Sequence, residues 1–370
     1  MDKSASTDIA ESTLASVAEA IELTASVGLV YVSDTDAGIR RVKRGERFAY
    51  LGTDDRTLRD AKVLARIASL AIPPAYENVW ICAKDRGHLQ ATGYDARGRK
   101  QYRYHPEWRS ARDGAKFERM IEFGDALPKL RRRLHRDLKL PGLSRDKVLA
   151  AVVSLLDATR IRIGNAEYAR DNASFGLTTL KDKHVTFVRD GRARFTFKGK
   201  GGLEHDVTVD DKRLSRIVRN CQHIPGQQLF QYLDDDGARH PITSDLVNAY
   251  LQEAMGEDFT AKDFRTWSAT LSAIALMAAT PLPEAPSERA FKAAIVTAIK
   301  AVAAELRNTP TVARKSYINP VVFTAWRSGA LHKAIEGRLE GAPRKAEKFA
   351  LTFLRAEAKA AAKAARKPKK

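Results

Sequence analysis

The chain has 370 residues, and its 64 Lys and Arg residues against 45 Asp and Glu residues leave a formal net charge of +19. With 44% hydrophobic and 29% charged residues, this length predicts about two domains with substantial cores and excludes a chain that is disordered throughout. The positive excess attracts polyanions, namely DNA, RNA or an anionic membrane, although a basic surface that only maintains solubility gives the same count.

The cysteines and the N-terminal sequence indicate the cellular compartment of the protein. Cys82 and Cys221 fall in different expected domains, which suits a reducing cytosol. Residues 1–25 are polar and acidic, without the basic start and apolar run of a secretory signal. No stretch approaches the roughly 18 apolar residues of a membrane span, and the histidines show no metal-ligand spacing. We therefore expect a cytoplasmic protein with no membrane contact and no metal site.

Short β-prone runs dominate the first third of the chain. Residues 1–27 predict a flexible leader, after which residues 28–105 alternate apolar runs such as Val79-Trp80-Ile81-Cys82 with turn residues. Turn residues between short β-prone runs are typical of antiparallel strands. One helix is expected between Leu58 and Ala71, before Pro73-Pro74. The pattern predicts a small, mainly antiparallel α+β domain.

Helices and then a sheet follow this first region. Long basic helices are expected over residues 111–139, and residues 147–157 repeat apolar side chains at the spacing of a buried helix. Three strands are expected between Val185 and Val209, with an Asp190-Gly191 hairpin turn after the first. The segment thus combines a helical core with a three-stranded antiparallel sheet.

Helical periodicity returns near Ser215 and continues to the end of the chain. With the segments before it, this predicts a larger, mainly α-helical domain over residues 106–355. Residues 356–370 form a basic Ala/Lys-rich tail that we expect to fray into solvent. The fold class predicted for the whole chain is α+β.

A tyrosine near the end of the chain stands among cations. Tyr317 lies in the run Arg314-Lys315-Ser316-Tyr317-Ile318-Asn319-Pro320. A phenol can attack a phosphodiester, but its ordinary pKa of about 10 requires nearby positive charge or a base at the moment of attack. A tyrosine in a basic segment is also commonly a plain surface or core residue, so both interpretations stay open at this point.

Two arginines stand in contexts that suit a phosphate clamp. Arg162 follows the expected buried helix and precedes an Ile-Gly pair, and Arg265 shares a helical segment with Lys262. We expect Phe264 and Trp267 to anchor this helix, with Arg265 and Lys262 facing outward. A guanidinium holds two non-bridging oxygens at once and stays charged. The alternatives are an ordinary salt-bridging arginine and an ordinary amphipathic face.

Lys200 occupies the tip of the second expected hairpin, among glycines at positions 199, 201 and 202. Such a tip can reach into a groove. Lysine carries three movable protons and shifts its pKa readily, which suits a general acid. The alternative is a turn lysine whose glycine neighbours serve the turn alone.

A short basic-aromatic strand is expected at Gln101-Tyr102-Arg103-Tyr104. Glutamine can read adenine edges, and the other side chains can contact phosphates or sugars. An alternating sheet strand with its tyrosines packed inward would have the same pattern.

The order of these motifs is more specific than any one of them. Arg-Ile-Gly-Asn, a Gly-Lys hairpin, Lys-Asp-Phe-Arg-Thr, Asn-Thr-Pro and Lys-Ser-Tyr follow one another along the chain. This series resembles the type IB DNA topoisomerases, and most of all the short poxvirus-like form found also in bacteria. The resemblance extends over nearly all of residues 28–355 and includes the segments Ile72–Tyr76, Gly98–Tyr102 and Ser174–Lys181.

The resemblance implies a role for each candidate. Tyr317 would be the nucleophile that becomes joined to a DNA 3′-phosphate. Arg162 and Arg265 would hold the scissile phosphate and stabilise its charge. Lys200 would be the general acid that protonates the leaving 5′-oxygen, with support from Lys262.

One position departs from the viral and eukaryotic pattern. Asn308 stands where those enzymes have histidine. Its amide can still donate a hydrogen bond to a non-bridging oxygen, but it cannot become cationic. The resemblance also implies DNA contacts by Gln101, Tyr102 and Tyr104 in the N-terminal domain and by Tyr168 in the catalytic domain.

The expected activity follows from the resemblance. A monomeric, two-domain clamp on double-stranded DNA would cut one strand, let it rotate and rejoin it, without ATP, metal or another cofactor and without an obligate protein partner. Its place would be the cytoplasm, at the nucleoid. A tyrosine recombinase is the first alternative, although Lys262 stands where recombinases usually have histidine. The second is a non-catalytic DNA-packaging protein, which needs the charge but not Tyr317.

Overall fold

The computed structural model describes the chain except for residues 1–16, 19, 336–342 and 366–370. It divides into two compact units, Met1–Lys116 and Phe117–Lys370. Most of the expected leader lies outside the described residues. Within the described parts, no helix has both the length and the apolar character needed to cross a bilayer.

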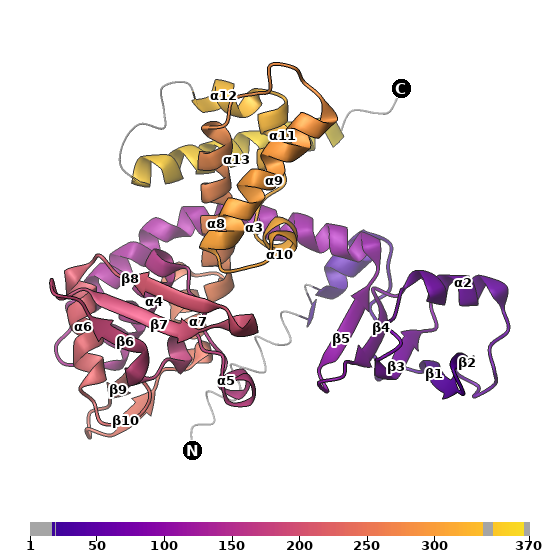
Figure 1. The fold of residues 1–370 in the computed structure, drawn as a ribbon, viewed down its shortest axis with the longest axis horizontal. Helices are drawn as coiled ribbons and strands as arrows, with labels where there is room; N and C mark the ends of the chain where they lie inside the picture. Colours follow the sequence, from indigo (N-terminus) through magenta and orange to yellow (C-terminus); the bar gives the residue numbers. More distant parts are fainter. Residues whose placement is uncertain (1–16, 19, 336–342, 366–370) are drawn as a thin grey trace. The chain divides into compact units, whose positions relative to one another are not determined.

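The first unit is built on a five-stranded antiparallel sheet, drawn in indigo and purple in Figure 1. The sheet order is β2-β1-β3-β4-β5, and the strands are β1 (Gly38–Arg44), β2 (Arg47–Leu51), β3 (Glu77–Cys82), β4 (Leu89–Tyr94) and β5 (Lys100–Tyr104). Helix α2 (Ala61–Ser69) contributes Ile67 to a core that includes Ile39 and Ile81. The predicted antiparallel α+β region is confirmed, although β1 was not foreseen because its sequence is mostly basic.

Helix α3 (Pro106–Asp137) leads into the second unit, which is mainly helical and contains the larger core. Its other helices are α4 (Arg145–Thr159), α5 (Ala166–Asn172), α6 (Lys212–Gln222), α7 (Ser244–Met255), α8 (Ala261–Ala278), α9 (Glu288–Glu305), α10 (Pro310–Ser316), α11 (Val321–Arg327), α12 (Ala330–Ile335) and α13 (Pro343–Ala365). Helix α4 is apolar on nearly all sides, and every residue from Val148 to Leu156 except Ser154 is almost fully buried. A helix of this kind belongs at the centre of a core; α4 packs against α6, α7 and α8.

A three-stranded antiparallel sheet of order β6-β7-β8 lies in the second unit, as predicted. Its strands are β6 (Val185–Phe187), β7 (Ala193–Lys198) and β8 (Glu204–Thr208). Along β7, Ala193, Phe195 and Phe197 point into the core while the residues between them are exposed. This period of two fixes which face of the hairpin meets the rest of the unit.

Two expectations for the C-terminal half are wrong. The helical pattern after Ser215 is interrupted by a hairpin of β9 (Gln231–Leu233) and β10 (Arg239–Pro241), because the Asp-rich run ending at Gly237 forms a turn. The expected tail also does not fray at residue 356, since α13 continues to Ala365. Ala, Lys and Glu, which fill this stretch, are strong helix formers.

Candidate active site

The backbone that carries Arg162 is tightly fixed. Helix α4 ends at Arg160, which has a left-handed φ of 59°. The Arg162 carbonyl then accepts the Leu177 amide at 2.9 Å. A Cβ added at Gly176 would lie 2.5 Å from the same carbonyl, so only glycine permits this approach of the two segments. The amide of Phe175 also donates to the Lys198 carbonyl at 2.8 Å, which joins the segment to the end of β7.

The Arg162 guanidinium is held by neutral acceptors. Its Nη2 donates to Asn308 Oδ1 at 2.6 Å and to the Arg307 carbonyl at 3.4 Å. Its Nη1 is buried and has no hydrogen-bond partner among the described residues. Asn308 Nδ2 is likewise buried without a partner. The bond to Arg162 occupies the Asn308 oxygen, so the unpartnered amide group of Asn308 is a donor.

Arg265 belongs to α8, and the expectation that it faces outward is wrong. It is only 3% exposed. One guanidinium nitrogen donates to the Arg160 carbonyl and the other to the Leu306 carbonyl, the latter at 2.8 Å. These carbonyls lie at the C-terminal ends of α4 and α9, where helical acceptors are left free and carry partial negative charge. That arrangement allows a guanidinium to be buried there, while its Nε remains buried without a partner.

Tyr317 ends helix α10, and its amide donates to the Ala313 carbonyl at 3.1 Å. The Arg265 guanidinium lies over its ring, 5.1 Å from the centroid. Burial alone would raise the pKa of the Tyr317 hydroxyl. The positive charges of Arg265, Arg162 and Lys262 outweigh burial and hold this pKa below its ordinary value. The site therefore favours the phenolate, which is the nucleophilic form.

The two arginines are not neutralised by acids. Burial lowers the pKa of Arg162, and burial together with the charge of Arg162 lowers the pKa of Arg265. Tyrosines supply the only counteracting interactions recorded for these two groups, and no carboxylate contributes among the described residues. Buried cations without paired acids are costly unless an anion joins them. The cluster of Arg162, Arg265, Asn308, Lys262 and Tyr317 is called the cationic cluster below.

The structure brings together five of the six predicted catalytic residues. Lys262 is exposed in the first turn of α8, close enough to act on the Tyr317 pKa. Lys200 is the sixth; it is exposed at the tip between β7 and β8, in the short 3₁₀ turn Lys200–Gly202. Among the described residues it has no recorded hydrogen bond or ion pair, so its side chain is free to reach a ligand.

Two buried residues near the cluster were not found from the sequence. Thr270, on α8, is fully buried; its hydroxyl donates to the Tyr317 carbonyl at 3.2 Å and accepts the Asn319 amide at 3.1 Å. The signal was a polar residue on the buried side of an apolar helix. His205, on β8, is 4% exposed, and the charges of Arg162, Arg307 and Arg265 reach it.

The predicted DNA-contacting strand is β5 of the first unit. Tyr102 is 46% exposed and stacks on Tyr104 with centroids 6.0 Å apart, while Tyr104 stacks on Trp108 at 4.5 Å. Lys100 lies 5.8 Å from the Tyr102 ring. Gln101 donates one amide hydrogen to Asp95 at 3.0 Å, which leaves its second amide hydrogen and its carbonyl oxygen for other contacts. The strand thus presents an aromatic and basic surface.

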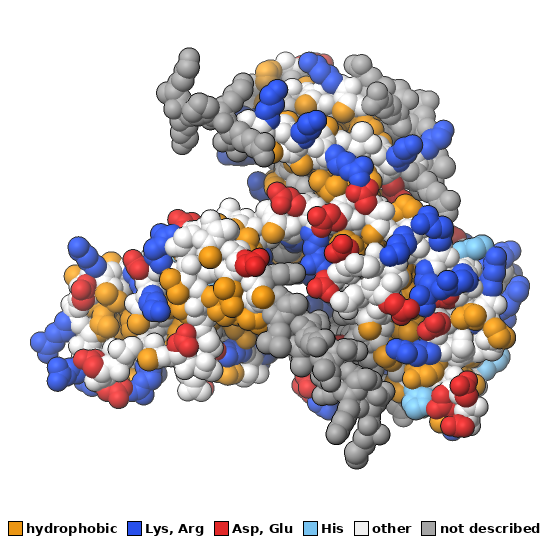
Figure 2. All heavy atoms as spheres, turned by 180° about the vertical axis from the view of Figure 1, so that it is seen from behind, with side chains coloured by type: hydrophobic (Ala, Val, Ile, Leu, Met, Phe, Trp, Pro, Cys, Tyr) orange, Lys and Arg blue, Asp and Glu red, His pale blue; other side chains and the backbone are white. Residues whose placement is uncertain are grey.

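Tyr168, on α5, is half-buried in the second unit and acts on the Arg162 pKa, which places it near the cationic cluster. On the face drawn in Figure 2, Lys and Arg side chains cover much of the surface, with Asp and Glu among them. Within the described parts of the chain, no group of three or more His, Cys, Asp or Glu side chains is placed to hold a metal ion.

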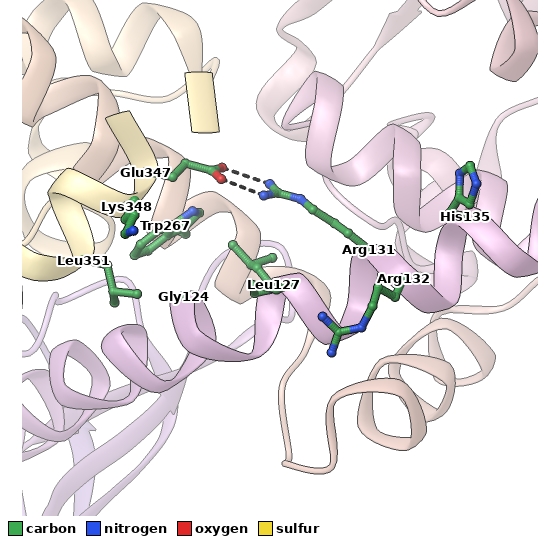
Figure 3. A pocket seen from close by; sticks show the side chains of 10 residues that line it. Gly124, Leu127, Arg131, Arg132, His135, Trp267, Glu347, Lys348 and Leu351 are labelled. Carbon is green, nitrogen blue, oxygen red and sulfur yellow. Dashed lines mark hydrogen bonds and ion pairs between the residues drawn. The ribbon is translucent and has the colours of Figure 1, made fainter. Parts of the chain in front are cut away.

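A cavity of about 600 Å³ lies in the second unit (Figure 3). Leu127, Arg131, Trp267, Glu347 and Leu351 are among its lining residues, and none of the predicted catalytic residues is. Arg131 and Glu347 form an ion pair of 2.6 Å across it. This cavity is therefore not the site of the expected chemistry.

The chain is similar to known DNA topoisomerases over most of its length. Residues 105–330 match the family model "Eukaryotic DNA topoisomerase I, catalytic core", and residues 47–95 match "Bacterial DNA topoisomerase IB, N-terminal domain". DNA topoisomerase 1B of Acanthamoeba polyphaga mimivirus is 34% identical over 286 residues, which cover 76% of this chain and 85% of that protein. DNA topoisomerase 1B of Vaccinia virus (strain Copenhagen) is 23% identical over 257 residues, or 67% of this chain and 75% of the viral protein.

These matches decide among the alternatives that the sequence left open. The catalytic-core model alone covers more than half of the 370 residues. This match favours a topoisomerase over a tyrosine recombinase and over a non-catalytic DNA-packaging protein. The chain belongs to the type IB DNA topoisomerases and is an isomerase that acts on DNA.

Proposed function

We propose that Tyr317 is the nucleophile with which this topoisomerase cuts one DNA strand, and that the rest of the cationic cluster binds the scissile phosphate. The observation that carries the proposal is the convergence of three unpartnered donors, Arg162 Nη1, Arg265 Nε and Asn308 Nδ2, around a tyrosine of lowered pKa. A phosphodiester in the cluster would accept hydrogen bonds from these donors and neutralise charge that no acid neutralises.

In the proposed cleavage step, the phosphoryl group is transferred from the 5′-oxygen to the oxygen of Tyr317. The Tyr317 hydroxyl loses its proton to solvent, and its oxygen forms a bond to phosphorus. The bond from phosphorus to the 5′-oxygen breaks, and its electron pair remains on that oxygen. Lys200 then supplies a proton to the 5′-oxygen, while Arg162 and Arg265 stabilise the charge on the non-bridging oxygens. The products are a 3′-phosphotyrosyl link and a free 5′-hydroxyl.

Rejoining is the reverse of this step. The 5′-hydroxyl gives its proton to Lys200 and attacks phosphorus, and Tyr317 leaves as a phenolate. Between the two steps the free end rotates, and torsional strain in the DNA drives relaxation of supercoils. The phosphotyrosyl bond retains the energy of the phosphodiester, so we expect relaxation to require neither ATP nor a divalent cation.

We further propose how the parts of the chain share the DNA. Residues 106–355 would form the catalytic domain, with Tyr168 as one of its DNA contacts. Residues 28–105 would clamp DNA through Gln101, Tyr102 and Tyr104, and their support is the exposed aromatic stack on β5 beside Lys100. Aromatic and cationic side chains suit sugar, base and phosphate contacts.

The active species is proposed to be a monomer that associates with the nucleoid. Its support is that all five residues of the cationic cluster come from one compact unit of one chain. Sedimentation of the protein bound to a short duplex would test this, because a dimeric active species would sediment with two chains per cleaved site.

The proposal is tested by relaxation of supercoiled plasmid and by mapping of the covalent adduct. Wild-type protein should relax plasmid in EDTA without ATP, and denaturation during the reaction should trap DNA on a peptide that contains Tyr317. Tyr317→Phe should lose relaxation by at least about 10⁴-fold, since no nucleophile remains, while its affinity for duplex DNA stays within a few-fold. A DNA link to another residue, or relaxation by Tyr317→Phe, would contradict the assignment.

A further inference from the structure

The turn that carries Lys200 contains glycines of two kinds. Gly201 and Gly202 have left-handed φ values of +77° and +75°, and a Cβ at either position would meet open space. They serve the conformation of the turn. Gly199 has φ −94°, which any residue can adopt. A Cβ there would nevertheless lie 2.6 Å from Nε2 of His205, so glycine is required because the imidazole fills the space.

The His205 ring is also held by Phe197. His205 pairs with Phe197 across β7 and β8, and the two rings stack with centroids 4.6 Å apart at 7°. The side chain is almost fully buried. Gly199 itself closes the turn, because its amide donates to the Leu203 carbonyl at 2.8 Å and its carbonyl accepts the Gly202 amide at 3.0 Å. The ring therefore packs against the root of the turn and not against its tip.

His205 also lies within reach of the cationic cluster. Burial, followed by the charges of Arg162, Arg307 and Arg265, lowers its pKa to about 4. His205 is consequently neutral at pH 7 and adds no positive charge to the phosphate site. One residue thus adjoins both the arginines that would hold the phosphate and the root of the turn that carries Lys200.

We infer that His205 is a positioning residue for Lys200: its ring fixes Gly199, and with it the point from which Lys200 extends toward the 5′-oxygen of the bound DNA. The inference rests on the proposed role of Lys200 as general acid. Proton transfer requires a donor about 3 Å from the oxygen, and a displacement of about 1 Å can cost on the order of 10²-fold in rate. Loss of the ring would let the root of the turn shift.

The test compares two leaving groups in single-turnover cleavage. One duplex has the ordinary 5′-oxygen at the cleavage site, and the other has a bridging sulfur there, which leaves as a thiolate without help from an acid. His205→Ala should cleave the oxygen substrate about 10- to 100-fold more slowly than wild type. It should cleave the sulfur substrate within about threefold of wild type, because general-acid help is no longer needed. Equal slowing on both substrates would overturn the inference.

Two further variants examine the same contact. Gly199→Ala forces a Cβ against the ring and should show the same selective loss on the oxygen substrate, which keeps the test decisive if His205→Ala does not fold. In the double variant Gly199→Ala/His205→Ala the Cβ enters the vacated space. Cleavage of the oxygen substrate by the double variant should be no slower than by His205→Ala alone; multiplied defects would contradict a shared contact.

His184 provides a matched control. It is a buried histidine that lies near Phe197, with centroids 6.3 Å apart, and its pKa is also lowered by burial. The atoms nearest to a Cβ at Gly199 belong to His205 and Leu203 and not to His184. His184→Ala should lose stability without any preference between the two leaving groups. A preference equal to that of His205→Ala would make the effect a general consequence of disturbing this sheet and would overturn the inference.

Lys200→Ala separates this inference from the proposed function. It should be slow on the oxygen substrate and nearly normal on the sulfur substrate. If sulfur does not restore its cleavage, Lys200 is not the acid, and the role of His205 falls with it. If sulfur restores Lys200→Ala but not His205→Ala, the proposed function stands and only the inference about His205 fails.

Discussion

Two groups of arginines in the catalytic unit have opposite surroundings. On α3, Arg131 pairs with Glu347 at 2.6 Å and with Asp157 at 3.2 Å. The bonds to Glu347 raise its pKa despite partial burial. Arg133, two residues further along α3, is likewise surrounded by Asp and Glu side chains. These arginines hold helices of the unit together, and Figure 3 shows the Arg131–Glu347 pair.

In the cationic cluster the same residue type meets only neutral acceptors. Arg162 binds Asn308 and a carbonyl, and Arg265 binds two carbonyls. Burial lowers the pKa of both. The difference teaches that the number of arginines does not reveal their purpose. An arginine with acids nearby is already satisfied, whereas a buried arginine without acids is prepared for an anion from outside.

The largest effect that would test this comparison is on catalysis. Arg162→Lys keeps a positive charge but loses the planar guanidinium, so we expect single-turnover cleavage to fall by about 10²–10³-fold. The free energy of unfolding should change little, because no ion pair is lost. Arg160→Lys is the control, since its guanidinium pairs with Glu305 outside the cluster. Cleavage at the wild-type rate by Arg162→Lys would contradict the distinction between arginines paired with acids and arginines that bind the phosphate.

The opposite result is expected on α3. Arg131→Met should lower the free energy of unfolding by about 1–3 kcal/mol, because it leaves Glu347 and Asp157 without their partner in a partly buried place. The folded Arg131→Met protein should cleave DNA at close to the wild-type rate. Chemical denaturation and single-turnover cleavage measure the two quantities, with the exposed neighbour Arg132→Met as control. A loss of cleavage without a loss of stability would contradict the structural role of Arg131.

A smaller effect should follow from the hydroxyl beneath Tyr317. Thr270→Val keeps the volume but removes the bonds to the Tyr317 carbonyl and the Asn319 amide. We expect cleavage to slow by about tenfold, equivalent to about 1.4 kcal/mol, with unchanged DNA affinity. Thr270→Ser should restore the rate, which a purely packing role would not predict. If both variants cleave alike, the hydroxyl does not position the nucleophile.

The smallest expected effect concerns pH. The folded pKa of Tyr317 lies below its ordinary value, so the unfolded state binds more protons between the two pKa values. The contribution of Tyr317 to stability should therefore grow as pH rises through the folded pKa toward about 10, and it should be absent below that window. The difference in unfolding free energy between wild type and Tyr317→Phe measures it. Arg162→Ala should raise the lower edge of this window, because it removes a positive charge that lowers the folded pKa; an unchanged lower edge would mean that Arg162 does not act on the hydroxyl.

Much of the fold was predictable because strong periodicities coincide with real elements. The apolar run in α4 and the alternating strands β6 to β8 were found for this reason. Strand β1 was missed because its side chains are mostly basic, and the β9–β10 hairpin was missed because its strands are very short. In both cases pairing with neighbouring strands determines the structure, and a local pattern does not contain that information.

Motif order pointed to residues that the structure brings together in the cationic cluster, but it did not reveal that Arg265 is buried. From α8 alone, Arg265 appeared suited to an outward face, since the carbonyls that accept its hydrogen bonds come from α4 and α9. Thr270 and His205 depend in the same way on partners far away in the sequence. Local patterns pointed to the candidate residues, while the residues packed around them become visible only when distant segments are brought together.

The bond from the Phe175 amide to the Lys198 carbonyl has a consequence for timing. It ties the end of β7, directly before the turn, to the segment that follows Arg162, so the hairpin is held up to the point where the turn that carries Lys200 begins. If Lys200 is the acid, rotation about a few glycine backbone dihedrals would let it move away from the cleavage site while the cationic cluster still holds the phosphate. The lifetime of the cut state, and hence the number of turns released in each event, would then depend on a small loop and not on opening of the whole unit.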